Sequence, residues 1–143
     1  MTNCKSVVTP TSVKSAKISS PSPDFHNPSL FRQLVGSLQY LTLTRPDITY
    51  AVNKVSQHMH QPSEKHFEDL KRILRYIHGS LHIGLPLYSN SITLTAYVDS
   101  DWDGEQSDRK STSGYCMFFG NTLTSWSVKK QATVARSSTE AEY

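Results

Sequence analysis

The sequence predicts an α+β chain in which a helical segment is followed by a strand-rich segment. Two observations predict this class. Between residues 28 and 84, apolar residues recur every three or four positions, which is typical of amphipathic helices. After Gly84 the apolar period changes to two, which is typical of half-buried strands. The length of 143 residues fits one ordinary domain or two small ones.

Residues 1–27 precede the first periodic segment. They are rich in Ser, Thr, Pro and Lys and show no apolar periodicity. We therefore expect an extended tail or linker that packs poorly by itself.

Three helices are expected between residues 28 and 84. The first begins after Asn27, a favoured N-cap residue, with Pro28 at the first helical position, where a missing N–H costs nothing. The second begins at Pro46-Asp47, where the acidic side chain suits the positive end of the helix dipole. Their apolar stripes are Leu30, Leu34, Leu38 and Leu41 in the first helix, and Ile48, Ala51 or Val52, Val55 and Met59 in the second.

The third helix has the clearest pattern. Ser63 is the expected N-cap, and Gly79 is placed to end the helix. Glu68 lies one turn before Arg72, the favourable order for a helical ion pair. The apolar stripe consists of Phe67, Leu70, Leu74, Ile77 and Leu81.

Three strands are expected after residue 84. The first alternates apolar and other residues from Ile92 to Val98. Two β-rich runs, residues 115–119 and 122–128, are joined by Gly120-Asn121, a favourable two-residue hairpin turn. The chain then reaches Thr139–Tyr143, which is typical of the first turn of a helix.

Three aspartates follow the first strand at alternating positions: Asp99, Asp101 and Asp103. A calcium loop would require a Glu at the twelfth position, and that position holds Lys110. A second hypothesis places Asp99 as a Mg²⁺ ligand on a rigid strand end. The local pattern alone favours a solvated acidic turn at the strand end over the metal site.

Other polar residues have similar alternatives. Thr139 and Glu142 have capping-box spacing, which would explain both residues without catalysis. The six histidines lack cysteines or acids at zinc-site spacing and are interpreted as surface residues.

Basic residues form two groups that could follow a phosphate backbone. The first lies on the third helix, and the second surrounds the strands. The net charge of +3 allows a nucleic-acid partner without requiring one. The candidate nucleic-acid-binding residues are Lys71, Arg72, Arg75, Lys129 and Lys130.

No apolar run is long enough to span a membrane, and no signal-peptide pattern occurs at Met1. We therefore expect no membrane partner and a cytoplasmic or nuclear location. Cys4 and Cys116 lie far apart and are expected to be reduced thiols.

Several long strings in the sequence carry a family resemblance. "VGSLQYLTLTRPDI", "RILRYIHGS", "DRKSTSGY" and "SSTEAEY" closely resemble the Pol polyprotein of copia-type LTR retrotransposons. The resemblance runs from about residue 28 to the last residue. It implies that residues 28–84 are the helical C-terminal part of the reverse transcriptase. It also implies that residues 85–143 are the N-terminal part of a ribonuclease H-like domain with a mixed sheet, truncated in this chain.

The resemblance also implies an activity and a site. The family's ribonuclease H hydrolyses the RNA strand of an RNA–DNA hybrid with two metal ions, expected to be Mg²⁺. By position, Asp99 matches the first catalytic aspartate and Glu142 the glutamate of the first helix, so both are the expected catalytic and metal-binding residues. Asp101 and Glu140 are nearby acids with at most a supporting role.

Two departures from the family pattern limit the expected activity. No Asp-Asp pair of the polymerase site occurs in the chain, and the family's later ribonuclease H acids lie beyond residue 143. We therefore expect a retrotransposon fragment that is inactive alone and needs the rest of the polyprotein to complete its fold. The alternative is a non-catalytic nucleic-acid-binding remnant that uses the basic residues. Sequence alone leaves open whether the chain is an enzyme.

Overall fold

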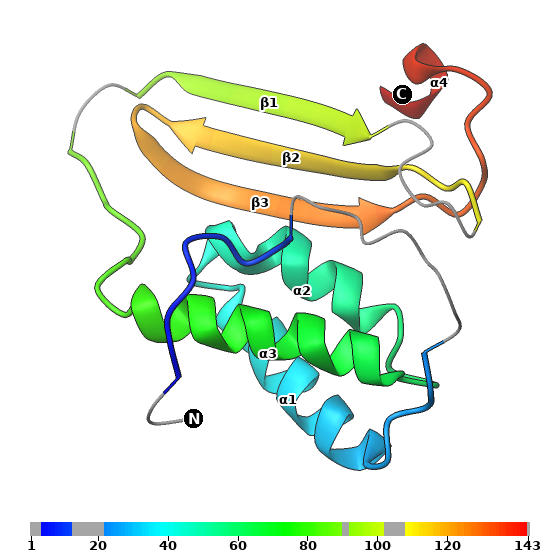
Figure 1. Cartoon of the computed structure of the whole chain (residues 1–143). Helices are drawn as coiled ribbons and strands as arrows, with labels where there is room; N and C mark the ends of the chain where they lie inside the picture. Colours follow the sequence, from blue (N-terminus) through cyan, green and yellow to red (C-terminus); the bar gives the residue numbers. More distant parts are fainter. Residues whose placement is uncertain (1–3, 13–21, 90–91, 102–107, 143) are drawn as a thin grey trace. The chain divides into compact units, whose positions relative to one another are not determined.

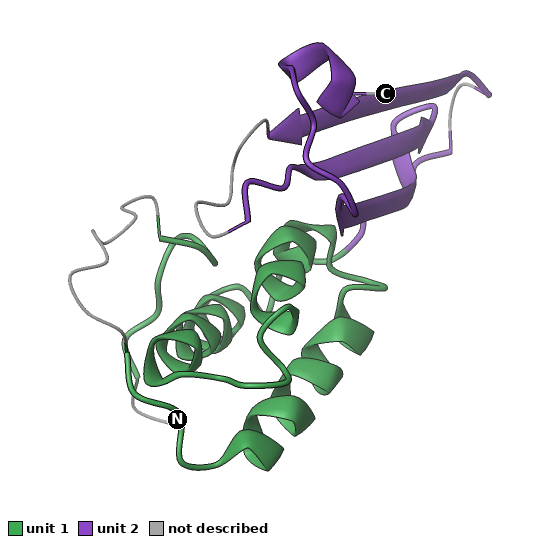
Figure 2. Cartoon of the chain, turned by 90° about the vertical axis from the view of Figure 1, so that its right-hand side faces the viewer, with its two compact units in different colours: residues 1–84 green, residues 85–143 purple. Residues whose placement is uncertain are grey.

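A computed structural model describes residues 4–12, 22–89, 92–101 and 108–142 of the chain (Figure 1). The chain divides into two compact units, residues 1–84 and residues 85–143 (Figure 2). The division falls where the apolar period of the sequence changes from helical to strand-like. The architecture is thus α/β in content, with helices in the first unit and the sheet in the second.

The first unit contains the three predicted helices, α1 (Pro28–Leu41), α2 (Thr49–Ser56) and α3 (Glu64–Gly79). A short 3₁₀ helix, η1 (Pro46–Ile48), leads directly into α2. Both predicted N-caps are confirmed, because the Leu30 amide donates to Asn27 Oδ1 over 3.0 Å and the His66 amide donates to Ser63 Oγ over 3.4 Å. These side chains satisfy amide groups that the first helical turn leaves unpaired.

The helices bury one shared apolar core. Three residues of the predicted α1 stripe pack in or against this core, namely Leu34, Leu38 and Leu41. Leu30 is instead 37% exposed, and the sequence analysis missed Phe31 and Val35, which are fully buried. On α3 the sequence analysis missed Ile73, which is buried, and included Leu81, which is 74% exposed beyond the helix end. The stripe of α2 is as predicted. The buried residues of the core are Phe25, Phe31, Val35, Leu38, Ile48, Ala51, Val52, Val55, Leu70 and Ile73.

One residue of the expected tail or linker, Phe25, packs into the helical core. Phe25 is 3% exposed and stacks on Phe67 of α3, with ring centroids 4.1 Å apart. Its amide donates to the Pro62 carbonyl over 2.8 Å. A single aromatic residue without periodic neighbours gives no sequence signal, yet its burial removes a large apolar surface from water.

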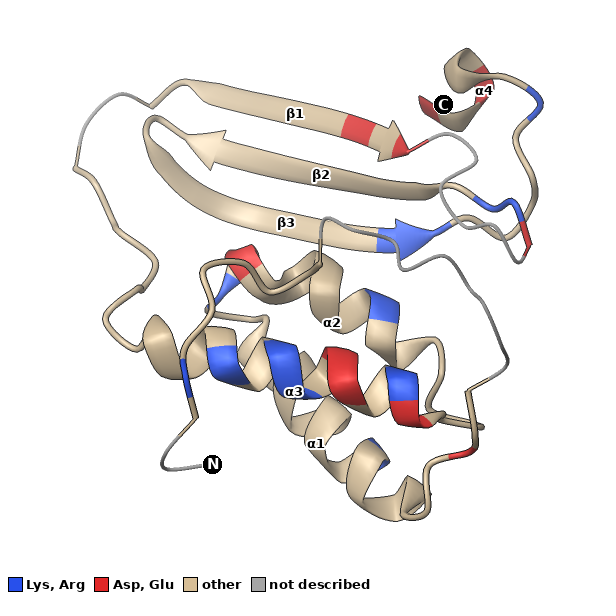
Figure 3. Cartoon of the chain, in the orientation of Figure 1, with Lys and Arg blue, Asp and Glu red and all other residues tan. Residues whose placement is uncertain are grey.

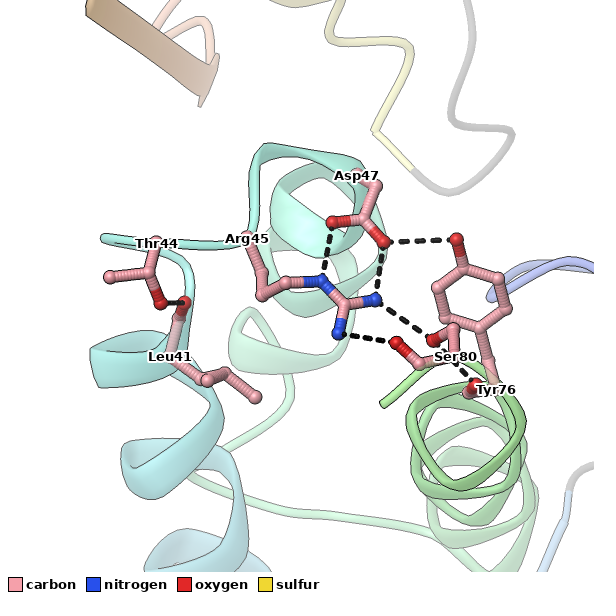
Figure 4. Close-up of polar contacts among 6 residues, drawn as sticks. All are labelled: Leu41, Thr44, Arg45, Asp47, Tyr76 and Ser80. Atoms are coloured by element: carbon pink, nitrogen blue, oxygen red, sulfur yellow. Dashed lines mark hydrogen bonds and ion pairs between the residues drawn. The ribbon is translucent and has the colours of Figure 1, made fainter. Parts of the chain in front are cut away.

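A buried polar cluster ties the start of η1 to the end of α3 (Figure 4). Arg45 is 6% exposed and binds Asp47 through two parallel bonds, Nε–Oδ1 of 2.8 Å and Nη2–Oδ2 of 2.7 Å. Its Nη1 donates to the Ser80 carbonyl over 3.1 Å, and the Tyr76 hydroxyl donates to Asp47 Oδ2 over 2.9 Å. The hydrogen bonds from Arg45 hold the pKa of the Asp47 carboxyl below its usual value. Asp47 was predicted to interact with the positive end of the helix dipole; its carboxylate also binds Arg45 and Tyr76.

The N-terminus of α3 has a capping box that requires a neutral histidine. His66 Nδ1 accepts a hydrogen bond from the Ser63 amide over 3.0 Å, and the His66 ring stacks on His58 with centroids 3.6 Å apart. Burial, and then the charges of His58 and Lys65, lower the pKa of His66 to about 4. Protonation would remove the acceptor of the capping bond.

We expect the stability of the helical unit to fall as the pH drops from about 6.5 to about 4. In that window the unfolded chain binds a proton at His66 that the folded chain excludes, so acid favours unfolding. His66→Gln keeps a capping-box side chain but does not titrate, and should flatten this dependence. Urea unfolding followed by circular dichroism at pH 7 and pH 5 measures it. Equal pH dependence in both proteins would contradict this role of His66.

The second unit contains β1 (Leu94–Asp101), β2 (Thr112–Phe119), β3 (Thr122–Lys130) and the short helix α4 (Ser138–Glu142). The strands form an antiparallel sheet in the order β1-β2-β3. The predicted Gly120-Asn121 hairpin turn is confirmed, and Gly120 adopts a φ of 58°, which favours glycine. The parallel pairing that a mixed sheet would need does not occur among the described strands.

The outer strand β1 is largely exposed in the described unit. Leu94, Tyr97 and Val98 keep 63 to 65% of their surface accessible, although the alternation predicted a half-buried strand. The predicted alternation is present, but these three side chains remain mostly uncovered. Among the described residues, no helix is long and apolar enough to cross a lipid bilayer.

Candidate functional site

The acidic site begins at the C-terminal end of β1. The strand extends three residues beyond the predicted end at Val98, so Asp99 lies on regular strand backbone opposite Gly114 of β2. Asp99 is exposed, and its Oδ1 accepts a hydrogen bond from the Ser100 amide over 2.9 Å. Asp101 is the last residue of β1, and its Oδ1 accepts a hydrogen bond from the Thr112 amide. Asp103 lies outside the described residues.

Helix α4 supplies the second acid. The cap of α4 is formed by Ser137 and Glu140: Ser137 Oγ accepts from the Glu140 amide over 3.1 Å, and Glu140 Oε2 accepts from the Arg136 amide over 2.7 Å. The predicted alternative, a capping box between Thr139 and Glu142, is therefore wrong, because the helix begins at Ser138. Glu140 has the structural role, and Glu142 is not needed for it.

Glu142 lines an open pocket of about 560 Å³ at this end of the sheet. Helix α4 packs against β1 here, with Ala141 almost fully buried (Figure 1). Gln131 joins the helix to the sheet, because its Nε2 donates to the Ala141 carbonyl over 2.6 Å and to Ser113 Oγ over 2.8 Å. The other lining residues are Val98, Lys129, Lys130, Ala132, Thr133, Ala135 and Glu140.

Asp99 does not line this pocket. Successive side chains of a strand point to opposite faces, and Ser100 lies on the face of Ser113, to which its Oγ is 3.3 Å distant. Asp99 therefore belongs to the other face of β1. Because β1 is the outer strand of the described sheet, a ligand beside its open edge could be approached from both faces.

The donor set fits a hard divalent cation only in part. Carboxylate oxygens are the ligands that Mg²⁺ prefers, and it usually binds one or two of them while keeping several waters. Asp99 and Glu142 could supply two such carboxylates. Within the described ranges, no three His, Cys, Asp or Glu side chains form a group that could hold a metal ion.

Several basic residues lie along α3 (Figure 3), and two of them, Arg72 and Arg75, contact the N-terminal segment of the chain. Arg72 donates from Nε to the Thr9 carbonyl over 3.1 Å and from Nη2 to Thr9 Oγ1 over 2.8 Å. Arg75 Nε donates to the Lys5 carbonyl over 2.7 Å. The guanidinium of Arg72 is thus used for Thr9, and the predicted helical pair with Glu68 is not its role here. Lys71 Nζ lies 5.2 Å from the centre of the Phe67 ring.

The two lysines at the end of β3 differ in their surroundings. Lys130 Nζ forms an ion pair with Asp108 Oδ1 over 3.0 Å, and this hydrogen bond lowers the pKa of the Asp108 carboxyl. Lys129 is exposed. Both lysines line the pocket that contains Glu142, so this end of the sheet combines acidic and basic groups.

Comparison with known proteins identifies the family. An uncharacterised mitochondrial protein of Arabidopsis thaliana is 51% identical over 100% of the chain. The retrovirus-related Pol polyproteins from transposons RE2 and RE1 of the same plant are 46% identical over 100% of the chain and 54% identical over 82% of it. This chain belongs to the family of copia-type retrotransposon Pol polyproteins. The family resemblance predicted from the sequence strings is confirmed.

The copia-type Pol chain spans only part of its relatives. It covers 60% of the length of the mitochondrial protein, 10% of the RE2 polyprotein and 8% of the RE1 polyprotein. No protein-family model matches the chain, and no solved structure matches it.

Two features of the site were missed from the sequence. The Ser137–Glu140 cap has the same three-residue spacing as Thr139–Glu142, so the spacing alone could have been assigned to either pair. The contact between α3 and residues 4–12 joins segments more than sixty residues apart, and no local pattern signals it.

Proposed function

We propose that this copia-type Pol chain binds RNA–DNA hybrids. Residues 28–84 would be the end of the reverse transcriptase and would grip the nucleic-acid backbone through Lys71, Arg72 and Arg75. Residues 85–143 would be the first part of a ribonuclease H-like domain, with Asp99 and Glu142 as ligands of Mg²⁺. Lys129 and Lys130 would contact phosphates near these acids.

One observation carries the proposal for the acidic site. Glu140 and Ser137 satisfy the start of α4, so Glu142 has no capping role, and it lines the pocket where α4 packs on β1. Asp99 follows Val98 on β1 and lies on the opposite face of the strand, at the end against which α4 packs. Mg²⁺ is commonly bound through one or two carboxylates while it keeps several waters, which two acids on neighbouring elements could supply.

The chemistry follows from these groups. A bound Mg²⁺ would lower the pKa of a coordinated water and stabilise charge that develops on phosphate oxygens. Asp99 and Glu142 would hold the ion in position, and the lysines would orient the anionic backbone. Among these 143 residues, only two carboxylates match the family's site. Losing even a residue that hydrogen-bonds to a metal ligand usually lowers metal affinity or activity about 10- to 100-fold, so missing ligands should cost at least as much. We therefore propose that the chain alone binds hybrid but does not hydrolyse it efficiently.

Measuring the binding of an RNA–DNA hybrid tests whether the basic residues of α3 bind the nucleic-acid backbone. The affinity for a labelled RNA–DNA duplex, measured by fluorescence anisotropy, should fall steeply as salt rises, because phosphate contacts release counterions. Replacing Lys71, Arg72 and Arg75 together by Ala should reduce the slope of log affinity against log salt by about three. Lys54→Ala, an exposed lysine of α2, is the matched control and should change little. Affinity independent of salt would contradict the proposal.

Hydrolysis of the same duplex with Mg²⁺ tests the catalytic part. We expect no turnover above that of Asp99→Asn. Rapid turnover that Asp99→Asn abolishes would uphold the site and contradict the claim that two matching carboxylates are insufficient.

A further inference from the structure

We propose that residues 4–12 form a strap that covers the basic side of α3 and competes there with nucleic acid. This inference rests on the proposed function, because it concerns how the same cations become available to a hybrid. The strap is not a catalytic element. It would set the affinity of the helical unit by occupying its arginines.

The contacts of the strap resemble those that a phosphate backbone would make. Two successive basic positions of α3, one turn apart in the helix, donate to oxygen atoms of an extended chain: Arg72 to Thr9, and Arg75 to Lys5. Arginine has a planar array of donors that suits phosphate oxygens at least as well as carbonyl oxygens. The strap thus uses the donors that a phosphate backbone would use.

The end of α3 is shaped to receive the strap. A Cβ atom added at Gly79 would lie 2.6 Å from Ser6 Cβ, whereas one added at Gly36 or Gly84 would meet nothing within 4 Å. Gly79 has no positive φ, so the close approach of Ser6 is the reason that a side chain does not fit there. Gly79 is the last residue of α3, and its lack of a side chain makes room for the strap.

The strap is held weakly enough to be displaced. Lys5, Ser6, Val8 and Thr9 are exposed, so little apolar surface stabilises it. Residues 4–12 contain no acidic side chain and one lysine, so they offer only neutral oxygens to the arginines. Phosphates are anionic, and charge-assisted bonds are about twice as strong as neutral ones. A hybrid should therefore be able to replace the strap at low salt.

Gly79→Ala tests the competition without deleting the strap. The added methyl group collides with Ser6 and should lift the strap, while alanine favours the helix. We expect about 3- to 10-fold tighter binding of the RNA–DNA duplex, which corresponds to the loss of a few exposed hydrogen bonds that the hybrid otherwise has to replace. Faster tryptic cleavage after Lys5 should report the release of the strap independently of nucleic acid.

The matched control is the double variant Ser6→Gly/Gly79→Ala. Removing Ser6 Cβ removes the collision, so the double variant should bind the hybrid and resist trypsin like the original chain. Unchanged affinity of Gly79→Ala together with faster cleavage after Lys5 would overturn the competition while leaving the proposed grip intact. Failure of every variant to bind hybrid, including one that lacks residues 1–12, would overturn the proposed function itself.

Discussion

Arg45→Ala should lower the free energy of unfolding of the helical unit by about 3 kcal/mol, because it removes one partner of a largely buried ion pair. The substitution removes the two bonds to Asp47 and the bonds to Ser80. It leaves the Asp47 carboxylate, whose side chain is 27% exposed, without its cation. Urea unfolding followed by circular dichroism at 222 nm reports the helical unit, since nearly all helix lies there.

Two further variants make this prediction specific. Arg32→Ala removes an exposed arginine whose contacts to Ser29 and Met59 are long, 3.4 and 3.5 Å, and should change stability by less than about 0.5 kcal/mol. Arg45→Ala/Asp47→Ala should cost less than the sum of the single substitutions, because the stranded charge is also removed. An Arg45→Ala protein as stable as the original would show that the cluster does not hold η1 to α3.

Asp99→Asn and Glu142→Gln should each weaken the binding of a divalent cation by about 10-fold or more, the largest effect that we expect on the candidate site. Each amide keeps the shape of the side chain and removes the negative charge. Both residues are exposed, so the fold should remain intact. Titration with Mn²⁺, with the free ion measured by electron paramagnetic resonance, gives the affinity. Glu68→Gln, an exposed acid of α3, should have no effect on it.

Local signals in the sequence were sufficient for most elements of the fold. Asn27-Pro28, Ser63 and Gly120-Asn121 act within three or four residues, so the helix starts and the hairpin turn could be predicted. Interactions across long sequence separations could not. Phe25 is buried by packing against α3, and Arg45 reaches Ser80 across 35 residues. Such contacts depend on how the helices are arranged, which periodicity does not specify.

The residues of the candidate site stay a prediction, although the elements that carry them are described. Asp99 and Glu142 follow from the family resemblance, and the strand and helix that carry them are present. Sequence spacing could not decide between Glu140 and Glu142 as the capping acid. The position of the helix start determines which carboxylate accepts a hydrogen bond from the amide that precedes the helix. The alternation of β1 also places Asp99 away from the pocket wall formed by Val98, so the pocket itself does not bring the two carboxylates together.

Paramagnetic broadening by Mn²⁺ tests this shared ion most directly. In the amide spectrum of the ¹⁵N-labelled chain, substoichiometric Mn²⁺ should broaden the signals around Asp99 and around Glu142 together. Asp99→Asn and Glu142→Gln should each abolish the broadening at both places. Broadening at only one of the two acids, or broadening at both that either substitution leaves unchanged, would contradict a cation held jointly by β1 and α4.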